Sequence, residues 1–372
     1  MAQQKKIARI FIALNIIIVF IYLLACLEPF LNAGEFWFIA ILGLIFPLLF
    51  FAMVLFLIGG LFSRSRYSWL TIIALLLSWQ QLAVVFSWHL PKTFTEAKAP
   101  GSLRIFQWNV SSWDERSKMK REDVTYRGQM FAEVKKSNAD ILCFEEFLES
   151  EDSTWFAPTV SDLTKMGYPF HYYERSYENK YKNSELGIII FSKYPIVNTG
   201  TFDFGDRISV QQLIYADVQY NNQTFRVFAI HLQSVRFGTK EYQSITELKH
   251  SDKSGLNDSK TIVSKLKRGY QFRSTQAEIV RSFIDKSPYP VILCGDFNDV
   301  PNSYTYFTIR GNLQDAFLQQ GSGIGRTFRF ISPTLRIDYI LADKKFSVNQ
   351  YYRLTVPYSD HYGVMADMSL DK

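Results

Sequence analysis

The chain has little of what several protein classes require. Only three cysteines occur in 372 residues, too few for the disulfide framework of a small secreted scaffold. Charged residues make up 20% and hydrophobic residues 48%, so the composition of a disordered chain, with low hydrophobicity and high net charge, is absent. What remains is a folded protein, and its length predicts two or three domains.

Three well-known catalytic motifs are also missing from the sequence. There is no glycine-rich P-loop, which disfavours that mode of nucleoside triphosphate binding. There is no G-x-S-x-G elbow, which disfavours serine hydrolase chemistry. No Cys/His set has the spacing of a zinc site. Any catalytic chemistry must therefore use other residues.

The first ninety residues carry very little charge and contain three apolar runs, at 10–27, 36–62 and 69–88. About 20 apolar residues span the hydrocarbon core of a bilayer. We therefore predict that residues 1–91 form a transmembrane segment with three helices.

Two alternatives stay open for this segment. The third run is diluted by Ser78, Gln80, Gln81 and Ser87, which also fits a buried or interfacial helix. The first run also fits a signal peptide, because Leu23-Leu24-Ala25-Cys26 resembles a bacterial lipoprotein cleavage box.

Basic residues predict the orientation in the membrane. They stand before the first run and between the second and third runs, at Lys5, Lys6, Arg9, Arg64 and Arg66. The loop between the first two runs holds only acidic charges, Glu28 and Glu35. The positive-inside rule then places the N-terminus in the cytoplasm and everything after about residue 91 outside it, in the periplasm if the membrane is a bacterial inner membrane. If the third run did not insert, the remainder would be cytoplasmic.

Residues 92–102 read as a linker, and residues 103–372 have the composition of one globular domain. Seven short apolar runs, rich in Ile, Val and Phe, predict strands: Leu103–Trp108, Ile141–Phe144, Gly187–Phe191, Leu213–Val218, Phe225–Ile230, Val291–Cys294 and Ile337–Leu341. Helices are expected at Arg127–Ser137 and Thr275–Asp285. Many strands with few helices indicate two packed sheets with helices outside.

The net charge of the globular part is only slightly positive, which is less than nucleic-acid-binding proteins usually carry. After the first 91 residues are set aside, 36 Lys and Arg face 33 Asp and Glu. Positive charge does collect in residues 236–273, where nine Lys and Arg face four Asp and Glu. This stretch is either a solvated loop or a group of basic residues at the edge of a phosphate-binding site.

Polar residues follow the predicted strands at the points where the strands end. They are Asn109, Glu145-Glu146, His231, Asp296 with Asn298, Asp338, and Asp360-His361. Carboxylate and amide oxygens are hard ligands that suit Mg²⁺ or Mn²⁺. The pattern therefore predicts a divalent metal site built from strand ends.

At these residues the chain resembles the endonuclease/exonuclease/phosphatase superfamily, which includes deoxyribonuclease I, abasic-site endonucleases, neutral sphingomyelinases and inositol polyphosphate 5-phosphatases. The resemblance rests on blocks in order: Trp-Asn109-Val, Phe-Glu-Glu146, Gly187-Ile-Ile-Ile-Phe-Ser192-Lys-Tyr-Pro195, Ala-Ile-His231-Leu, Gly-Asp296-Phe-Asn298, Arg-Ile-Asp338-Tyr and Ser-Asp360-His361. It implies an α+β fold, a four-layered α/β sandwich of two packed mixed β-sheets flanked by helices, here preceded by three transmembrane helices.

The resemblance also implies roles for residues. Glu146 resembles the main metal ligand, with Asn109 beside it and Asp360 as a further metal oxygen. Asp296 and Asn298 resemble the pair that orients the attacking water and the scissile phosphate. His361 resembles the histidine that contacts the phosphate, with Asp338 as its carboxylate partner. His231 resembles a second catalytic histidine of the deoxyribonuclease I and sphingomyelinase branches, where a carboxylate at the position of Glu185 supports it.

Two positions depart from the family pattern. Residue 145 is Glu where the family usually has Gln, so this side chain either strengthens metal binding or points the other way on its strand. Residue 111 is Ser where abasic-site endonucleases have Asp, which argues against abasic-site repair. Cys143 and Cys294 read as small core residues rather than nucleophiles or a disulfide pair.

The resemblance implies a membrane-anchored phosphoesterase that depends on Mg²⁺, or on Mn²⁺, and hydrolyses phosphodiester bonds by in-line attack of an activated water. The expected partners are a phosphate-ester substrate, either a lipid headgroup or a nucleic acid, and the lipid bilayer, with no protein partner. Three alternatives stay open: a sphingomyelinase-like phospholipid hydrolase, a tethered nuclease acting on extracytoplasmic DNA or RNA, and a membrane scaffold without catalysis.

Overall fold

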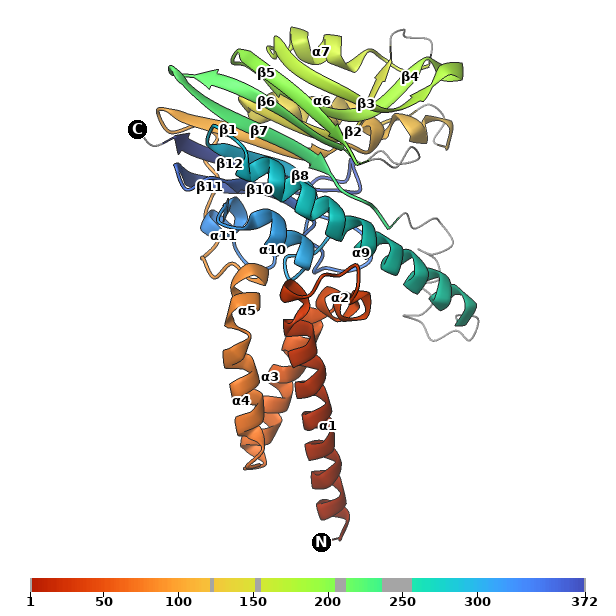
Figure 1. The fold of residues 1–372 in the computed structure, drawn as a ribbon, viewed down its shortest axis with the longest axis vertical. Helices are drawn as coiled ribbons and strands as arrows, with labels where there is room; N and C mark the ends of the chain where they lie inside the picture. The colour runs from red at the N-terminus through yellow and green to blue at the C-terminus, as the bar shows by residue number, and fades with distance from the viewer. Residues whose placement is uncertain (1, 121–123, 151–154, 205–211, 236–255, 371–372) are drawn as a thin grey trace. The chain divides into compact units, whose positions relative to one another are not determined.

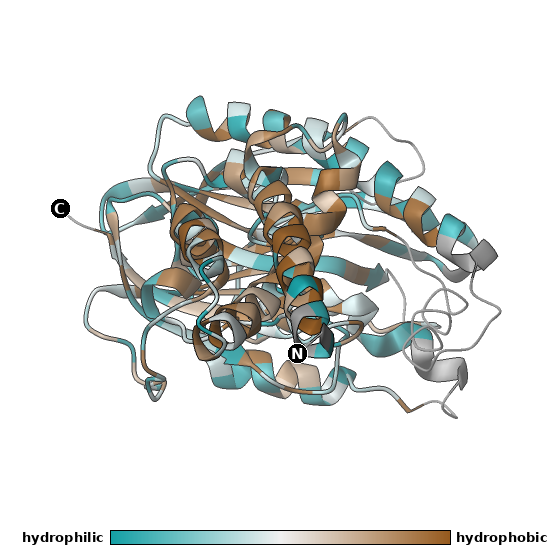
Figure 2. Cartoon of the chain, turned by 90° about the horizontal axis from the view of Figure 1, so that it is seen from below, coloured by the Kyte–Doolittle hydropathy of each residue, from teal (hydrophilic) through white to brown (hydrophobic). Residues whose placement is uncertain are grey.

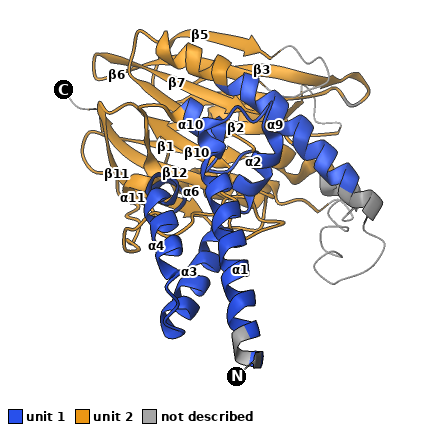
Figure 3. Cartoon of the chain, turned by 60° about the horizontal axis from the view of Figure 1, so that its bottom comes forward, with its two compact units in different colours: residues 1–86, 235–277, 299–309 blue, residues 87–234, 278–298, 310–372 orange. Residues whose placement is uncertain are grey.

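The computed structural model describes residues 2–120, 124–150, 155–204, 212–235 and 256–370 (Figure 1). It contains two compact units, which do not follow the order of the chain (Figure 3). Unit 1 comprises residues 1–86, 235–277 and 299–309, and unit 2 comprises residues 87–234, 278–298 and 310–372. Each unit is described separately below.

Unit 1 begins with a series of apolar helices, coloured as hydrophobic in Figure 2. They are α1 (Ala2–Cys26), the 3₁₀ turn η1 (Glu28–Phe30), α2 (Trp37–Leu44), α3 (Phe46–Phe62), α4 (Ser68–Leu77) and α5 (Trp79–Val85). One segment, Lys6–Phe30, is long and apolar enough by itself to cross a membrane.

The expectation of three transmembrane helices is not confirmed, because the second and third apolar runs are each broken into two helices. The bends are 64° between α2 and α3 and 62° between α4 and α5. Each bent pair has the length and composition of either one broken span or a re-entrant loop.

Both breaks have a local cause. Pro47 stands in the first turn of α3, where it removes a backbone donor and clashes with the preceding turn, so α2 ends before it. At the second break, the Ser78 hydroxyl donates to the Leu75 carbonyl oxygen at 2.8 Å and bonds the Tyr22 hydroxyl at 2.6 Å. Such side-chain bonds to the backbone compete with the regular helical pattern.

Unit 2 contains two six-stranded sheets. The first sheet has the order β11 (Phe346–Leu354), β12 (Gly363–Leu370), β1 (Ser102–Asn109), β2 (Ile141–Ser150), β4 (Ser184–Ser192) and β3 (Phe170–Asn179). The second has the order β5 (Ile196–Asp203), β6 (Gln212–Tyr220), β7 (Gln223–His231), β8 (Val291–Asp296), β10 (Asp338–Ala342) and β9 (Gln314–Asp315). The pairs β1–β2 and β7–β8 are parallel and the other described pairs are antiparallel, so both sheets are mixed.

The central strands are apolar on both faces, as expected for strands covered on both sides. In β1, Ile105 faces the core between the sheets, whereas Phe106 faces the core outside the first sheet. The core between the sheets also holds Cys143 and Cys294, both buried and unoxidised. The cysteines are therefore core residues, as predicted.

Helices cover the outer faces of the sheets. The first sheet is covered by α6 (Arg127–Ser137) and α7 (Thr159–Lys165), whose Val134 and Leu163 belong to its outer core. On the second sheet, Phe283 of α9 (Leu256–Asp285) packs on Phe202 of β5 with ring centroids 5.2 Å apart. The predicted architecture of two packed mixed sheets flanked by helices is confirmed.

All seven predicted strands and the helix at Arg127–Ser137 are present, and Thr275–Asp285 is the last part of α9. Sequence analysis missed β3, β5 and β11, which lie at sheet edges and have exposed polar residues. It also missed β12, a buried strand whose Ala, Met and Asp residues weaken the strand signal.

Candidate active site

The topology of unit 2 brings several strand ends to one edge of the sandwich. Because β1 and β2 run parallel, as do β7 and β8, the carboxyl ends of each pair lie together. The antiparallel strands β10 and β12 begin where their neighbours end, since Asp338 pairs with Asp296 and Val364 pairs with Gln107. Asn109 and Asp296, 187 positions apart in sequence, are thereby brought into contact.

Three of the predicted residues form one row across the second sheet. His231 of β7 is in register with Asp296 of β8, and Asp296 is in register with Asp338 of β10. Alternate residues of β8, Ile292 and Cys294, face the core between the sheets, so the period of two places Asp296 on that same face. All three residues of the row are buried.

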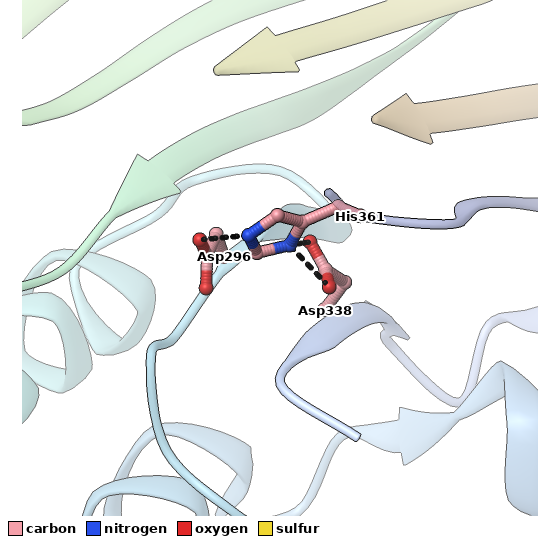
Figure 4. Close-up of side chains that lie close together, drawn as sticks. All are labelled: Asp296, Asp338 and His361. Carbon is pink, nitrogen blue, oxygen red and sulfur yellow. Dashed lines mark hydrogen bonds and ion pairs between the residues drawn. The ribbon is translucent and has the colours of Figure 1, made fainter. Parts of the chain in front are cut away.

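His361, which precedes β12 in the first sheet, reaches this row (Figure 4). Its Nδ1 atom lies 2.9 Å from Asp338 Oδ2, and its Nε2 atom lies 3.7 Å from Asp296 Oδ2. The His361 backbone is fixed as well, because the Trp108 indole donates to the His361 carbonyl oxygen at 3.0 Å. The imidazole is thus fixed between two carboxylates with its Nε2 atom directed at Asp296.

Asp296 is the centre of the cluster. Its Oδ2 atom lies 3.2 Å from Asn109 Nδ2 and 3.8 Å from His231 Nε2. Its Oδ1 atom accepts a hydrogen bond from the Asn298 backbone N–H at 2.8 Å, which closes a turn with Asn298 in the left-handed region at φ 52°. Gly295 permits close packing here, because a Cβ atom at this position would lie 2.1 Å from the Ile230 carbonyl oxygen.

The first sheet contributes Glu146 through an irregularity. The pairing of β2 with β4 shifts register between Phe144 and Phe147, and Glu146 has a φ of 49°. A bulge of this kind re-aims a side chain that a regular strand would point elsewhere. Glu146 Oε1 lies 3.5 Å from Asn109 Nδ2, so Asn109 stands between Glu146 and Asp296.

Glu145 lies in the interior between the sheets rather than beside Glu146. Its Oε2 atom accepts from Gln107 Nε2 at 2.8 Å, and the same nitrogen lies 3.1 Å from Asp338 Oδ1. Of the two interpretations of Glu145, the structure supports the one in which its side chain points away from Glu146.

Burial and mutual repulsion raise the pKa of several acids in the cluster. Burial raises the pKa of Asp296 to about 6, partly offset by the nearby histidines. Burial, with repulsion from Asp338 and Asp296, raises the pKa of Glu145 well above its usual range. Burial, with repulsion from Asp360, also raises the pKa of Glu146.

For His361, the nearby carboxylates outweigh burial in setting the pKa. Burial lowers its pKa, but Asp338 and Asp296, with the Asp338 hydrogen bond, hold the pKa well above the usual value. The described cluster therefore combines a histidine whose pKa is raised with several buried carboxyl groups.

The remaining predicted residues lie at different places. Asp360 accepts from the Ser359 hydroxyl at 3.2 Å and is close enough to raise the pKa of Glu146. Asn298 donates from its side chain to the Leu232 carbonyl oxygen at 3.0 Å. Glu185 lies on β4 in an ion pair with Arg175 at 2.6 Å, while the carboxylate found next to His231 is that of Asp296.

The donor atoms fit a divalent cation. Ligand atoms of Asp296, Asp338 and His361 all lie within 4.8 Å of one another. Glu146, Asn109 and Asp360 add hard oxygen donors, and the excess of negative charge needs either protons or a cation to balance it. The residues present are therefore able to bind a divalent cation, and its identity stays a prediction.

Sequence analysis missed Gln107 and Ser359, which shape this site. Gln107 joins Glu145 to Asp338, and the Ser359 hydroxyl donates to the Asn109 carbonyl oxygen at 2.7 Å and accepts from the His361 N–H at 3.1 Å. Phe328 packs on the His361 ring at 5.0 Å. Gln107 was detectable, because it precedes Asn109 by two residues and so shares its face of β1.

Two family models match parts of this chain. A family model described as "Endonuclease/Exonuclease/phosphatase family" matches residues 107–361, and a model described as a domain of unknown function matches residues 8–85. No curated protein matches the chain.

Solved structures resemble most of this chain in fold. The human Nocturnin catalytic domain with bound sulfate anion is 19% identical, with a TM-score of 0.51 over 72% of this chain and 93% of that one. An endonuclease/exonuclease/phosphatase from Beutenbergia cavernae is 18% identical, with a TM-score of 0.49 over 73% of this chain and 72% of that one. A family protein from Bacteroides thetaiotaomicron is 17% identical, with a TM-score of 0.49 over 74% of this chain and 100% of that one. Since the family model covers more than half of its residues, the chain belongs to the endonuclease/exonuclease/phosphatase family.

Proposed function

We propose that this protein is a membrane-anchored phosphoesterase that requires a divalent metal ion, Mg²⁺ or Mn²⁺, and that hydrolyses phosphodiesters. The observation that carries the proposal is the row of His231, Asp296 and Asp338, completed by His361 from the other sheet. Family membership supports phosphoester hydrolysis as the reaction class.

The geometry supports distinct roles in proton transfer. Asp296 is held by the Asn298 N–H on one oxygen, and the other oxygen faces both histidines. With a pKa of about 6, this carboxylate is suited to accept the proton of an attacking water near neutral pH.

His361 has a different role in this proposal. Its Nδ1 atom is engaged by Asp338, so Nε2–H is the group available to donate to a phosphate oxygen. The raised pKa keeps this proton in place as negative charge builds on the phosphate. His231, on the other side of Asp296, is placed to protonate the leaving oxygen.

Glu146, Asn109 and Asp360 would hold the metal ion. When bound, a divalent ion neutralises charge on the nonbridging oxygens and lowers the pKa of a coordinated water. Asn109 connects the two functions, since its amide lies between Glu146 and Asp296.

The apolar segment Lys6–Phe30 supports membrane anchoring. The charge pattern of the sequence favours a cytoplasmic N-terminus, with the bent pairs α2–α3 and α4–α5 as further spans and the catalytic domain on the extracytoplasmic side. Lipid phosphodiesters and nucleic acids are both chemically suitable substrates, and the experiment below separates them.

The test uses the full-length protein purified in detergent, given one mixture of phospholipids, sphingophospholipids and plasmid DNA with MgCl₂ or with EDTA. Metal-dependent release of a lipid headgroup would identify a lipid phosphohydrolase. Metal-dependent nicking of DNA with intact lipids would identify a tethered nuclease. Turnover that is equal with EDTA, or no turnover of any of these diesters, would contradict the proposed function.

A further inference from the structure

Unit 1 contains a buried carboxylate at the end of its apolar helix. Glu28 follows α1 directly, at the end of the segment Lys6–Phe30 that is able to cross a membrane, and only 1% of its surface is exposed. Its Oε2 atom is buried without a hydrogen-bond partner among the described residues. A buried acid in an apolar segment is costly, so its presence calls for a function.

Two hydrogen bonds join this turn to residues 299–305 within unit 1. The Tyr304 backbone N–H donates to Glu28 Oε1 at 3.0 Å. The Asn302 side chain donates to the Ala25 carbonyl oxygen, the end of α1, at 3.2 Å. The partners are 276 and 277 residues apart in sequence, so these bonds fix a long-range arrangement.

A buried ion pair lies beside this contact. Arg273 of α9 binds Asp299 Oδ2 at 3.1 Å, and the Thr305 hydroxyl donates to the same oxygen at 2.8 Å. Both charged side chains are 2% exposed, and both act electrostatically on Glu28. Residues 299–305 are therefore held at both ends, by Arg273 and by Glu28.

The helix α2 leaves space for the Glu28 side chain. A Cβ atom on Gly43 would lie 3.0 Å from the Glu28 carboxyl carbon, so only glycine at this position accommodates the carboxylate without displacement. An apolar contact completes the arrangement, because Tyr270 packs with Ala33 and Ala40 and its hydroxyl donates to the Ala40 carbonyl oxygen at 3.3 Å.

The segment that Glu28 holds continues directly from the candidate active site, since Asp299 is the next residue after Asn298. The proposed reaction uses the Asp296 side chain, which the Asn298 backbone N–H holds at 2.8 Å. Displacement of residues 299–305 would therefore be transmitted along the backbone to both.

We propose that Glu28 is a positioning residue: by fixing residues 299–305 it sets the position of Asp296 and Asn298, so the N-terminal helices form part of the catalytic machinery and are not an anchor alone. This inference rests on the proposed function. It also explains Arg273, the last base of the basic stretch 236–273, as a structural counterion rather than a phosphate-binding residue.

The experiment compares full-length wild type, Glu28→Ala, Glu28→Gln and Glu28→Asp in detergent, with bis(p-nitrophenyl) phosphate and MgCl₂ as the probe. Glu35→Ala is the matched control, because Glu35 is an exposed acid in the same connection between α1 and α2. We expect Glu28→Ala to lower kcat by up to about 10²-fold with KM unchanged, the size of effect that a small misplacement of catalytic groups produces. Glu28→Gln should restore turnover, since an amide oxygen also accepts from the Tyr304 N–H.

Hydrogen exchange gives a second readout that needs no turnover. Glu28→Ala should speed exchange at the Tyr304 amide, and also at the Phe297 and Asn298 amides, which bond the Ile337 carbonyl and the Asp296 carboxylate. Glu28→Gln and Glu35→Ala should match the wild type.

The outcomes separate the two proposals. If wild type does not hydrolyse the diester, the proposed function fails, and unchanged exchange at Phe297 and Asn298 then overturns the positioning role as well. If wild type is active and Glu28→Ala retains its kcat, the positioning role is wrong. If Glu28→Ala does not fold, Glu28→Asp decides, because the shortened side chain should give a partial loss, and full wild-type turnover would overturn the inference.

Discussion

The two sheets of unit 2 bring their polar residues to the candidate site in different ways. The second sheet uses regular pairing, which aligns His231, Asp296 and Asp338 across three neighbouring strands. The first sheet uses a bulge at Glu146. The regular sheet provides His231, Asp296 and Asp338, which are suited to proton transfer, and the irregular sheet adds His361 and the oxygen ligands suited to a metal. The comparison predicts that variants of the two sheets fail in different ways.

The largest effect is expected from Asp296→Ala, in the centre of the regular row. It removes the group that faces Asn109, His231 and His361, so kcat should fall by about 10²–10⁴-fold, the usual range for one proton-transfer role. Steady-state kinetics on a chromogenic phosphodiester would measure this. Asp203→Ala, an exposed acid of the same sheet, is the control. A variant that keeps more than half the wild-type rate would contradict the assignment.

A double-mutant cycle tests whether His361 and Asp338 act as a unit. Each of His361→Gln and Asp338→Asn should lower kcat by about 10²-fold or more, because the imidazole loses either its proton or its orientation. Since each change disables the same function, the double variant should be no slower than the slower single variant. Additive losses in log kcat would show that the 2.9 Å contact between them has no catalytic role.

A variant of the irregular sheet should lose activity because it binds the metal ion more weakly. Glu146→Gln keeps the shape of the side chain but removes a charge, so the MgCl₂ concentration for half-maximal activity should rise by about 10-fold or more. Activity at saturating MgCl₂ should recover substantially. Titration calorimetry of the variant with MgCl₂ checks the loss of affinity directly. An unchanged MgCl₂ requirement would place the metal elsewhere.

A smaller effect is expected at the neighbouring carboxyl. Glu145 is bonded by Gln107 and lies away from Glu146, so Glu145→Gln should keep kcat within about 3-fold, while removing a buried acid that costs stability. Glu145→Leu, which leaves Gln107 without this acceptor, should be clearly less stable in thermal unfolding. A large change in MgCl₂ requirement for Glu145→Gln would show that Glu145 is a metal ligand after all.

The contrast between regular pairing in the second sheet and the bulge in the first sheet explains how much of the site could be predicted from the sequence. The row of the second sheet follows from apolar strands that end in polar residues, and alternation alone places Asp296 and Asp338 on the face between the sheets. The bulge at Glu146 has no comparable local signal, so the direction of Glu146 could not be predicted, whereas strand alternation offered the observed direction of Glu145 as one of two interpretations. The helix breaks depend on Pro47 and on a tertiary bond between Tyr22 and Ser78, and only the proline is visible in sequence.

The partners of charged residues in ion pairs could not be predicted from the sequence either. Arg273 was counted in a basic stretch, but its role depends on Asp299, which the fold brings next to it. Glu185 was assigned to His231 by resemblance, which stays a prediction, and the structure records an ion pair between Glu185 and Arg175. Residues 236–255 of the basic stretch lie outside the described residues, so the interpretation of that part stays a prediction.

The smallest effect concerns a carboxyl beyond the bulge on the same strand. Glu149 accepts from the Val160 N–H at the start of α7 at 2.7 Å, and burial raises its pKa from 4.5 to about 7. Because the folded state binds this proton more tightly than the unfolded state, the stability associated with it is present below about pH 4.5 and is lost as the pH rises through 7. Glu149→Gln should therefore leave Tm unchanged at pH 4.5 and raise it at pH 8 by about 2–4 °C or less, since partial exposure screens the effect. Turnover should stay at the wild-type level, because Glu149 serves α7 and not the site. If the difference in Tm were the same at both pH values, the carboxyl would be ionised alike in the folded and unfolded states, and the strand beyond the bulge would hold its acids as exposed surface groups.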